Sequence, residues 1–217
     1  MQRVVFFSGM GADERAFSFL KFSGITSVFV NWIEPEKDES LKKYALRLIA
    51  NTPIYADDIL IGLSMGGFVA QEIASQFPVK KVILISTLRS GEALKPLFTA
   101  AQKLHLLNLV NADILKSTIV AGVKMYVPQH DKRLKVLIDM LDKQDGEYYK
   151  WAMNAVLNWQ GADVTCPVYH VHGDKDEVFP VSKATNATIV KGGHHFMLMS
   201  KAEEVGRIVQ YFIDQKE

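Results

Sequence analysis

The chain has 217 residues, of which 48% are hydrophobic and 23% are charged. This composition is typical of a single compact domain with a substantial core, and it excludes disordered and collagen-like proteins. Lysine and arginine (25) nearly balance aspartate and glutamate (24), so the net charge predicts neither nucleic-acid nor membrane binding. We therefore expect a small molecule as the partner.

The first residues, Met1–Phe7, form a short apolar run without a charged leader region or a small-residue cleavage pattern. They predict a strand and not a signal peptide. No stretch approaches the roughly 18 to 20 apolar residues of a membrane-spanning helix, so we expect a soluble, cytoplasmic protein. The single cysteine, Cys166, cannot form an internal disulfide, and we expect a structural thiol.

Six apolar runs of strand length predict the sheet: Arg3–Phe7, Ser27–Trp32, Ile59–Leu63, Val82–Ile85, Val168–His172 and Ala187–Val190. Most are continuously apolar, as in a sheet with helices on both faces. Segments with helical periodicity alternate with them at Ser40–Asn51, Met65–Phe77 and Ala202–Gln215. This alternation predicts an α/β fold with a mostly parallel central sheet of about six strands.

One interval, Gly91–Gln160, contains no strand-like run and includes helix-like segments at Asp131–Leu141 and Glu147–Trp159. We interpret it as a helical cap inserted into a single domain that spans residues 1–217. Its apolar residues are numerous, and we expect most to pack internally and a minority to line a pocket. They include Leu104, Leu106, Leu107, Leu109, Ile114 and Leu115.

The strand Ile59–Leu63 leads directly into the pattern G-x-S-x-G, centred on Ser64, and then into a helix-like segment. A nucleophilic serine needs this context because it must sit exposed on a tight strand-to-helix turn, with glycines that allow close backbone approach. The helix start beside Ser64 also offers unpaired N–H groups to developing negative charge.

This arrangement resembles the nucleophile elbow of the α/β-hydrolase family, and the resemblance covers nearly the whole chain. Family members carry an acid after a later strand and a histidine near the C-terminus. The first strand here corresponds to the family's third, so the leading antiparallel strands of common relatives are expected to be absent. The resemblance thus implies a minimal α/β-hydrolase fold with a helical cap.

The acid and base positions of the family can be found on two later loops. Asp176, in the segment after Val168–His172, matches the acid that holds the histidine in the correct tautomer, with Asp174 as the nearest alternative. His195, followed by Phe196 and an E-E-V helix start, matches the base, and His194 remains open.

The first strand ends in Ser8, Gly9, Met10 and Gly11, where relatives often place a histidine at the position of Ser8. The backbone N–H groups of Met10 and Met65 are expected to form the oxyanion hole, a task that depends little on side chains. The serine at position 8 raises the question of how this loop is held.

Two competing interpretations use some of the same residues. His170, His172 and Asp174 could suggest a metal site, but no further cluster completes a ligand set. Gly9-x-Gly11, with Glu34 after the second strand, could suggest a dinucleotide fold. That fold requires a third glycine where this chain has Glu14, whose charge would repel pyrophosphate.

The predicted chemistry is acyl transfer to water on a Ser64, Asp176, His195 triad, without a cofactor or metal. The expected substrate is a carboxylic ester or thioester with a small to medium apolar acyl group. The same constellation also serves carbon–carbon bond hydrolases, lyases and binding proteins that retain the pocket, so these remain alternatives.

Overall fold

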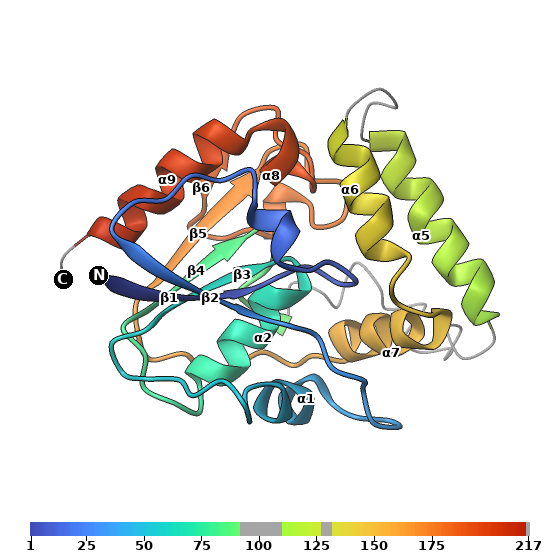
Figure 1. Cartoon of the computed structure of the whole chain (residues 1–217), viewed down its shortest axis with the longest axis horizontal. Helices are drawn as coiled ribbons and strands as arrows, with labels where there is room; N and C mark the ends of the chain where they lie inside the picture. The colour runs from blue at the N-terminus through green and yellow to red at the C-terminus, as the bar shows by residue number, and fades with distance from the viewer. Residues whose placement is uncertain (92–109, 127–131, 216–217) are drawn as a thin grey trace.

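The structure is a computed structural model that describes residues 1–91, 110–126 and 132–215. Six strands form one sheet in the order β2-β1-β3-β4-β5-β6, and every pairing is parallel (Figure 1). The strands are β1 (Gln2–Phe7), β2 (Ile25–Val30), β3 (Ile59–Leu63), β4 (Lys81–Ile85), β5 (Val168–Gly173) and β6 (Thr188–Val190). The predicted parallel α/β sheet is confirmed, although β2 begins two residues earlier than its apolar pattern indicated.

The central strands β3 and β4 are buried on both faces of the sheet, and their successive side chains point to opposite sides. Val4 and Phe6 of β1 belong to one apolar cluster, whereas Val5 and Phe7 belong to the other. The strands β3 and β4 divide in the same way. This explains why the central strands appear in the sequence as continuous apolar runs and not as alternating ones.

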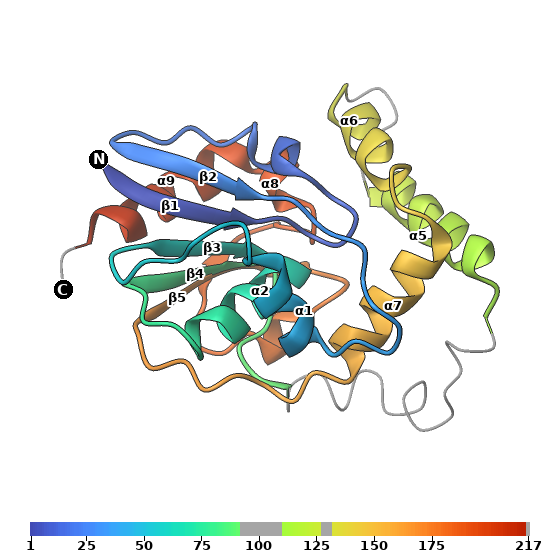
Figure 2. The ribbon, with the colours of Figure 1, turned by 60° about the horizontal axis from the view of Figure 1, so that its bottom comes forward.

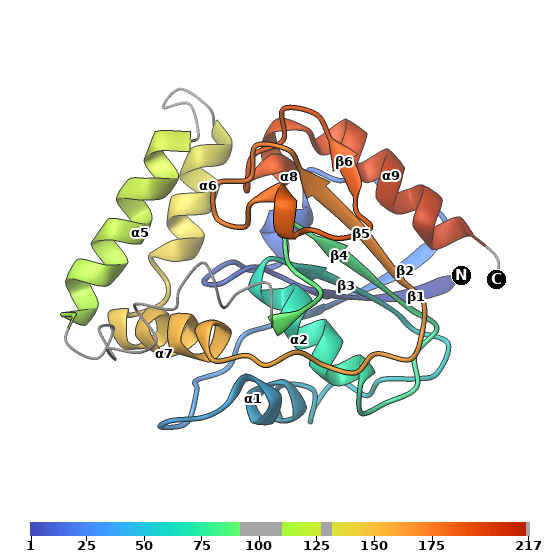
Figure 3. The ribbon, with the colours of Figure 1, turned by 180° about the vertical axis from the view of Figure 1, so that it is seen from behind.

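Helices cover both faces of the sheet (Figures 1 and 3). On one face lie the 3-10 turn η1 (Glu14–Phe17) and the helices α8 (Met197–Ser200) and α9 (Ala202–Asp214), whose apolar residues join the first cluster. On the other lie α1 (Leu41–Leu48) and α2 (Met65–Ala74), which join the second. The 3-10 turn η3 (Val181–Lys183) follows β5.

Local sequence explains the two outer helices. The Ser40 side chain accepts a hydrogen bond from the N–H of Lys43 and caps α1. In α9 the residues Val205, Val209 and Phe212 recur at helical spacing and are buried against the sheet.

Three further helices, α5 (Ala112–Tyr126), α6 (Lys132–Leu141) and α7 (Gly146–Leu157), lie beyond the carboxyl ends of the strands (Figure 2). No strand occurs between residues 110 and 160 in the part of the chain that is described, as the sequence predicted. Leu115 is buried, but Ile114 is 63% exposed, so the expectation of internal packing is wrong for Ile114, which lies on the outer face of α5. The predicted apolar residues Leu104, Leu106, Leu107 and Leu109 lie outside the described residues.

Candidate active site

Ser64 occupies the turn between β3 and α2 in a conformation that L-residues rarely adopt, with φ 49° and ψ −119°. Its N–H donates to the carbonyl of Ile85 at the end of β4, which fixes the turn to the sheet. The hydroxyl does not cap α2 and so stays available for another partner. Holding a serine in this region costs about 1–3 kcal/mol, which the surrounding structure must offset.

The glycines around Ser64 are required by close packing. A Cβ at Gly62 would collide with the backbone of Gly66 and Gly67, and one at Gly66 would collide with the carbonyl oxygens of Phe7 and Ser8. The turn therefore packs directly against the end of β1. This is the close backbone approach that the G-x-S-x-G spacing predicts.

The structure brings Ser64, His195 and Asp176 together from three separate loops. Ser64 Oγ lies 3.0 Å from His195 Nε2, and His195 Nδ1 lies 3.0 Å and 3.1 Å from the two carboxylate oxygens of Asp176. With Nδ1–H donating to the carboxylate, Nε2 is left as an acceptor for the serine hydroxyl. The two alternatives lie elsewhere: His194 contacts Glu177 at 3.3 Å, and Asp174 accepts from the N–H of Gly192 at 2.5 Å.

Asp176 is held ionised by its hydrogen bonds. Burial acts to raise the pKa of this carboxyl, but hydrogen bonding to His195 and to the N–H of Phe179 outweighs it, so the pKa lies below its ordinary value. Its Oδ1 accepts from Val178 N–H at 3.0 Å and Phe179 N–H at 2.7 Å. The fully buried His172 binds the Phe179 carbonyl at 2.7 Å and also supports this loop.

The loop after β1 is braced on both sides. The hydroxyl of Ser8 donates to the carbonyl of Ala12 at 2.7 Å. This hydrogen bond holds the loop in a chain that has serine where relatives often have histidine. The carbonyl of Gly9 accepts two hydrogen bonds, from Trp32 Nε1 at 2.9 Å and from Ala12 N–H at 3.0 Å. Because C=O and N–H of a trans peptide point in opposite directions, these bonds aim the N–H of Met10 away from Trp32.

Both backbone donors predicted for an oxyanion hole border the same cavity as Ser64. Met10 and Met65 line it, and Met65 is the first residue of α2, where N–H groups have no partner within the helix. A Cβ at Gly9 would lie 3.6 Å from the Cβ of Ser64, so the two loops are in contact beside the serine.

The cavity has a volume of about 340 Å³. It is bounded on one side by the loops at the carboxyl ends of the strands and on the other side by α5, α6 and α7. Ser64, His195 and Glu177 are its polar side chains among the described residues. The rest of its wall is apolar and includes Leu63, Phe68, Ile119, Val123, Leu137, Leu141, Met153, Val156, Phe179 and Phe196. The sequence did not predict that these residues form the wall, or that Trp32 supports the loop after β1. The pattern of apolar residues along a helix or strand does not show which other element its apolar face contacts.

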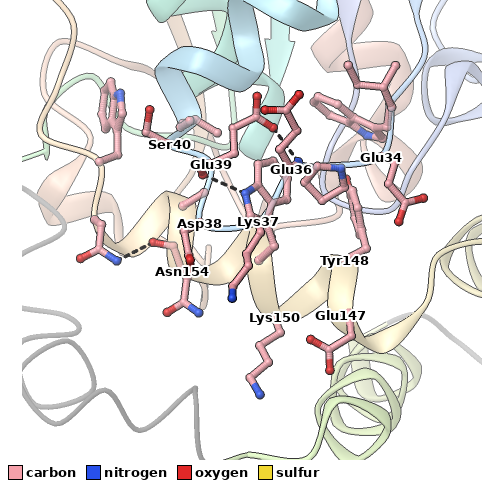
Figure 4. A pocket seen from close by; sticks show the side chains of 18 of the residues that line it. Glu34, Glu36, Lys37, Asp38, Glu39, Ser40, Glu147, Tyr148, Lys150 and Asn154 are labelled. Carbon is pink, nitrogen blue, oxygen red and sulfur yellow. Dashed lines mark hydrogen bonds between the residues drawn. The ribbon is translucent and has the colours of Figure 1, made fainter.

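A second hollow, of about 1200 Å³, lies between the loop that precedes α1 and the outer face of α7 (Figure 4). It shares no lining residue with the Ser64 cavity. Its side chains carry charges of both signs, and the buried Glu39 is paired with Arg47 at 2.8 Å. Although it is larger, it contains none of the three hydrogen-bonded residues, so we place the candidate site at the smaller cavity.

The competing interpretations find no support in the structure. Among the described residues no three His, Cys, Asp or Glu side chains are grouped so that they could hold a metal ion. His172 instead binds the Phe179 carbonyl, and Glu34 lines the second hollow and not the loop after β1.

Within the described ranges we also find no helix with the length and apolar character needed to cross a bilayer.

The parallel sheet, its strand order and the turn at Ser64 define the α/β-hydrolase fold. Solved structures of this fold superpose on nearly the whole chain. A hydrolase from Pseudomonas aeruginosa gives a TM-score of 0.71 with 15% identity, over 98% of this chain and 90% of its own. A thermophilic esterase from Thermogutta terrifontis gives 0.70 with 13% identity, over 98% and 89%. A putative non-heme bromoperoxidase from Mycobacterium tuberculosis gives 0.69 with 16% identity, over 100% and 94%.

No family model matches the sequence. Uncharacterized proteins from Mycobacterium tuberculosis and Mycobacterium bovis are 27% identical over 85% of this chain. The chain spans 64% of the length of these relatives.

Proposed function

We propose that this protein is a serine hydrolase that cleaves a carboxylic ester or thioester with a small to medium apolar acyl group. The observation that carries the proposal is the pair of hydrogen bonds from Ser64 to His195 and from His195 to Asp176, at the wall of an apolar cavity. Esterases and hydrolases among the superposable structures support the same reaction class.

In the proposed reaction His195 Nε2 takes the proton of the Ser64 hydroxyl while Oγ bonds to the carbonyl carbon. The carbonyl oxygen becomes an oxyanion that the N–H groups of Met10 and Met65 stabilise. The tetrahedral intermediate then expels the alcohol or thiol, which receives the proton from His195. Water, activated by the same imidazole, attacks the acyl-enzyme and releases the carboxylic acid together with free Ser64.

Labelling by a fluorophosphonate probe tests this proposal directly. The wild type should be labelled, Ser64→Ala should not, and Ser27→Ala, which removes an exposed serine from β2, should be labelled like the wild type. Equal labelling of wild type and Ser64→Ala would refute a nucleophilic role for this residue.

Turnover separates hydrolysis from the alternative of binding alone. The wild type should release p-nitrophenol from p-nitrophenyl esters and thiol from acyl thioesters, and Ser64→Ala should lose this release while still binding the acyl group. A protein that is labelled but turns over no member of an ester and thioester panel would contradict the proposed substrate class.

A further inference from the structure

Gly122 lies in the interior of α5, where glycine is the least favourable residue apart from proline. Its backbone is helical and does not require glycine, in contrast to Gly11 and Gly192, which have positive φ. The backbone conformation therefore does not explain why this position lacks a side chain.

Packing between the described elements does not explain it either. A Cβ at Gly122 would have no atom of the described residues within 4 Å. At Gly146, by comparison, a Cβ would collide with the backbone of Ala112, so glycine is needed there for α7 to begin beside α5. Gly122 instead lines the cavity that contains Ser64, and no atom of the described residues occupies the place of its missing side chain.

The cavity extends from the carboxyl ends of the strands to α5. Ser64 and His195 stand at the end of the sheet, whereas α5 is the helix of the α5–α7 group that lies farthest from it (Figures 1 and 2). Ile119 and Val123 of α5 line the same region as Gly122. A volume of about 340 Å³ holds roughly ten methylene-sized groups, if each takes about the 30 Å³ of a water molecule.

We propose that the cavity binds a medium-length apolar acyl chain whose methyl end lies against Gly122, and that this residue sets the longest chain accepted. The inference rests on the proposed function, because the carbonyl carbon is placed at Ser64. Among the described lining residues, Ser64, Glu177 and His195 have polar side chains, and the other side chains of the wall offer no hydrogen bond to a polar chain.

The test measures kcat/KM for p-nitrophenyl esters from acetyl to decanoyl in the wild type, Gly122→Val, Gly122→Leu and Ala121→Leu. Ala121 is the neighbouring residue of α5 and is exposed, so its variant is the matched control for added bulk on this helix. Each methylene in the cavity should raise wild-type kcat/KM about four-fold, which corresponds to ~0.8 kcal/mol per buried CH₂.

Gly122→Leu should exclude about three methylene groups and so lower kcat/KM for the longest accepted esters by about sixty-fold, with the acetyl ester unchanged. Gly122→Val should shift the limit less, and Ala121→Leu should keep the wild-type profile. An unchanged profile in Gly122→Leu, or an equal loss on every ester in a variant with wild-type circular dichroism, would overturn the proposal.

A binding measurement distinguishes failure of this inference from failure of the proposed function. If the wild type hydrolyses no ester, the hydrolase proposal fails, but calorimetric titration with decanoic acid still tests the cavity. Wild type and Ala121→Leu should then bind and Gly122→Leu should not. Equal binding by all three, or no binding by the wild type, would overturn the role of Gly122.

Discussion

Replacing Trp32 by phenylalanine should slow the chemical step without weakening substrate binding. The substitution removes the indole N–H that donates to the Gly9 carbonyl at 2.9 Å and keeps an aromatic ring beside Tyr44. Trp32 does not line the Ser64 cavity. Its expected influence is therefore exerted through the Gly9–Met10 peptide, which carries one of the two proposed oxyanion donors.

The size of the effect follows from the hydrogen bonds at Gly9. The Gly9 carbonyl keeps its hydrogen bond from Ala12 N–H at 3.0 Å. The Gly9–Met10 peptide should therefore be held less firmly but should keep its orientation. One such bond contributes about 0.5–1.5 kcal/mol, which corresponds to a fall in kcat of about 2- to 12-fold. This is well below the roughly 10²- to 10³-fold cost of removing an oxyanion donor outright.

Trp151→Phe is the matched control. It removes an indole N–H that donates to the Glu39 carbonyl at 2.9 Å, in a ring that also packs on Tyr44, and this hydrogen bond does not involve the loop after β1. Steady-state kinetics with a short p-nitrophenyl ester should show lower kcat at constant KM in Trp32→Phe alone. Equal kcat values in both variants and the wild type, or equal losses in both, would refute the reasoning.

Further predictions concern the acid, the packing and the pH dependence. Asp176→Asn should lower kcat by about 10⁴-fold in the same assay because the imidazole loses its orienting carboxylate, whereas Asp174→Asn should retain wild-type kcat. Gly66→Ala should lower the free energy of unfolding by up to about 3 kcal/mol in urea titrations, because the methyl group would meet carbonyl oxygens at the end of β1. Gly122→Ala should raise the free energy of unfolding by about 0.5–1 kcal/mol, and a loss would contradict the open space found there. Burial lowers the pKa of His170 to about 4 from 6.5, so the unfolded chain binds the extra proton between these values. Stability should therefore be complete above pH 6.5 and decline by up to about 3 kcal/mol as the pH falls to 4, and His170→Leu should flatten the decline in urea titrations.

The sheet could be predicted from the sequence because its central strands are buried on both faces. Continuous runs such as Ile59–Leu63 indicate a covered parallel strand, and the observed β3 has the same bounds. The glycine spacing around Ser64 was informative for a related reason, since backbone contact at Gly62 and Gly66 leaves no room for another residue.

Other parts of the site depend on tertiary contacts that leave no local pattern. His194 and His195 are adjacent, and only the path of the loop decides that one imidazole faces Ser64 and the other Glu177. The hydrogen bond from Trp32 to Gly9 joins residues 23 positions apart, in the loops that follow the neighbouring strands β2 and β1. The exposed Ile114 shows the same limit, because an apolar side chain in a helix does not reveal which face is covered.

At two positions on the wall of the cavity, the residue present is less favourable for the stability of the fold than another residue would be. At position 64 a glycine would relieve the backbone strain, and at position 122 an alanine would strengthen the helix. Screening random variants for heat resistance should therefore enrich substitutions at both positions. Those at position 64 should abolish turnover, and those at position 122 should narrow the range of esters that are hydrolysed.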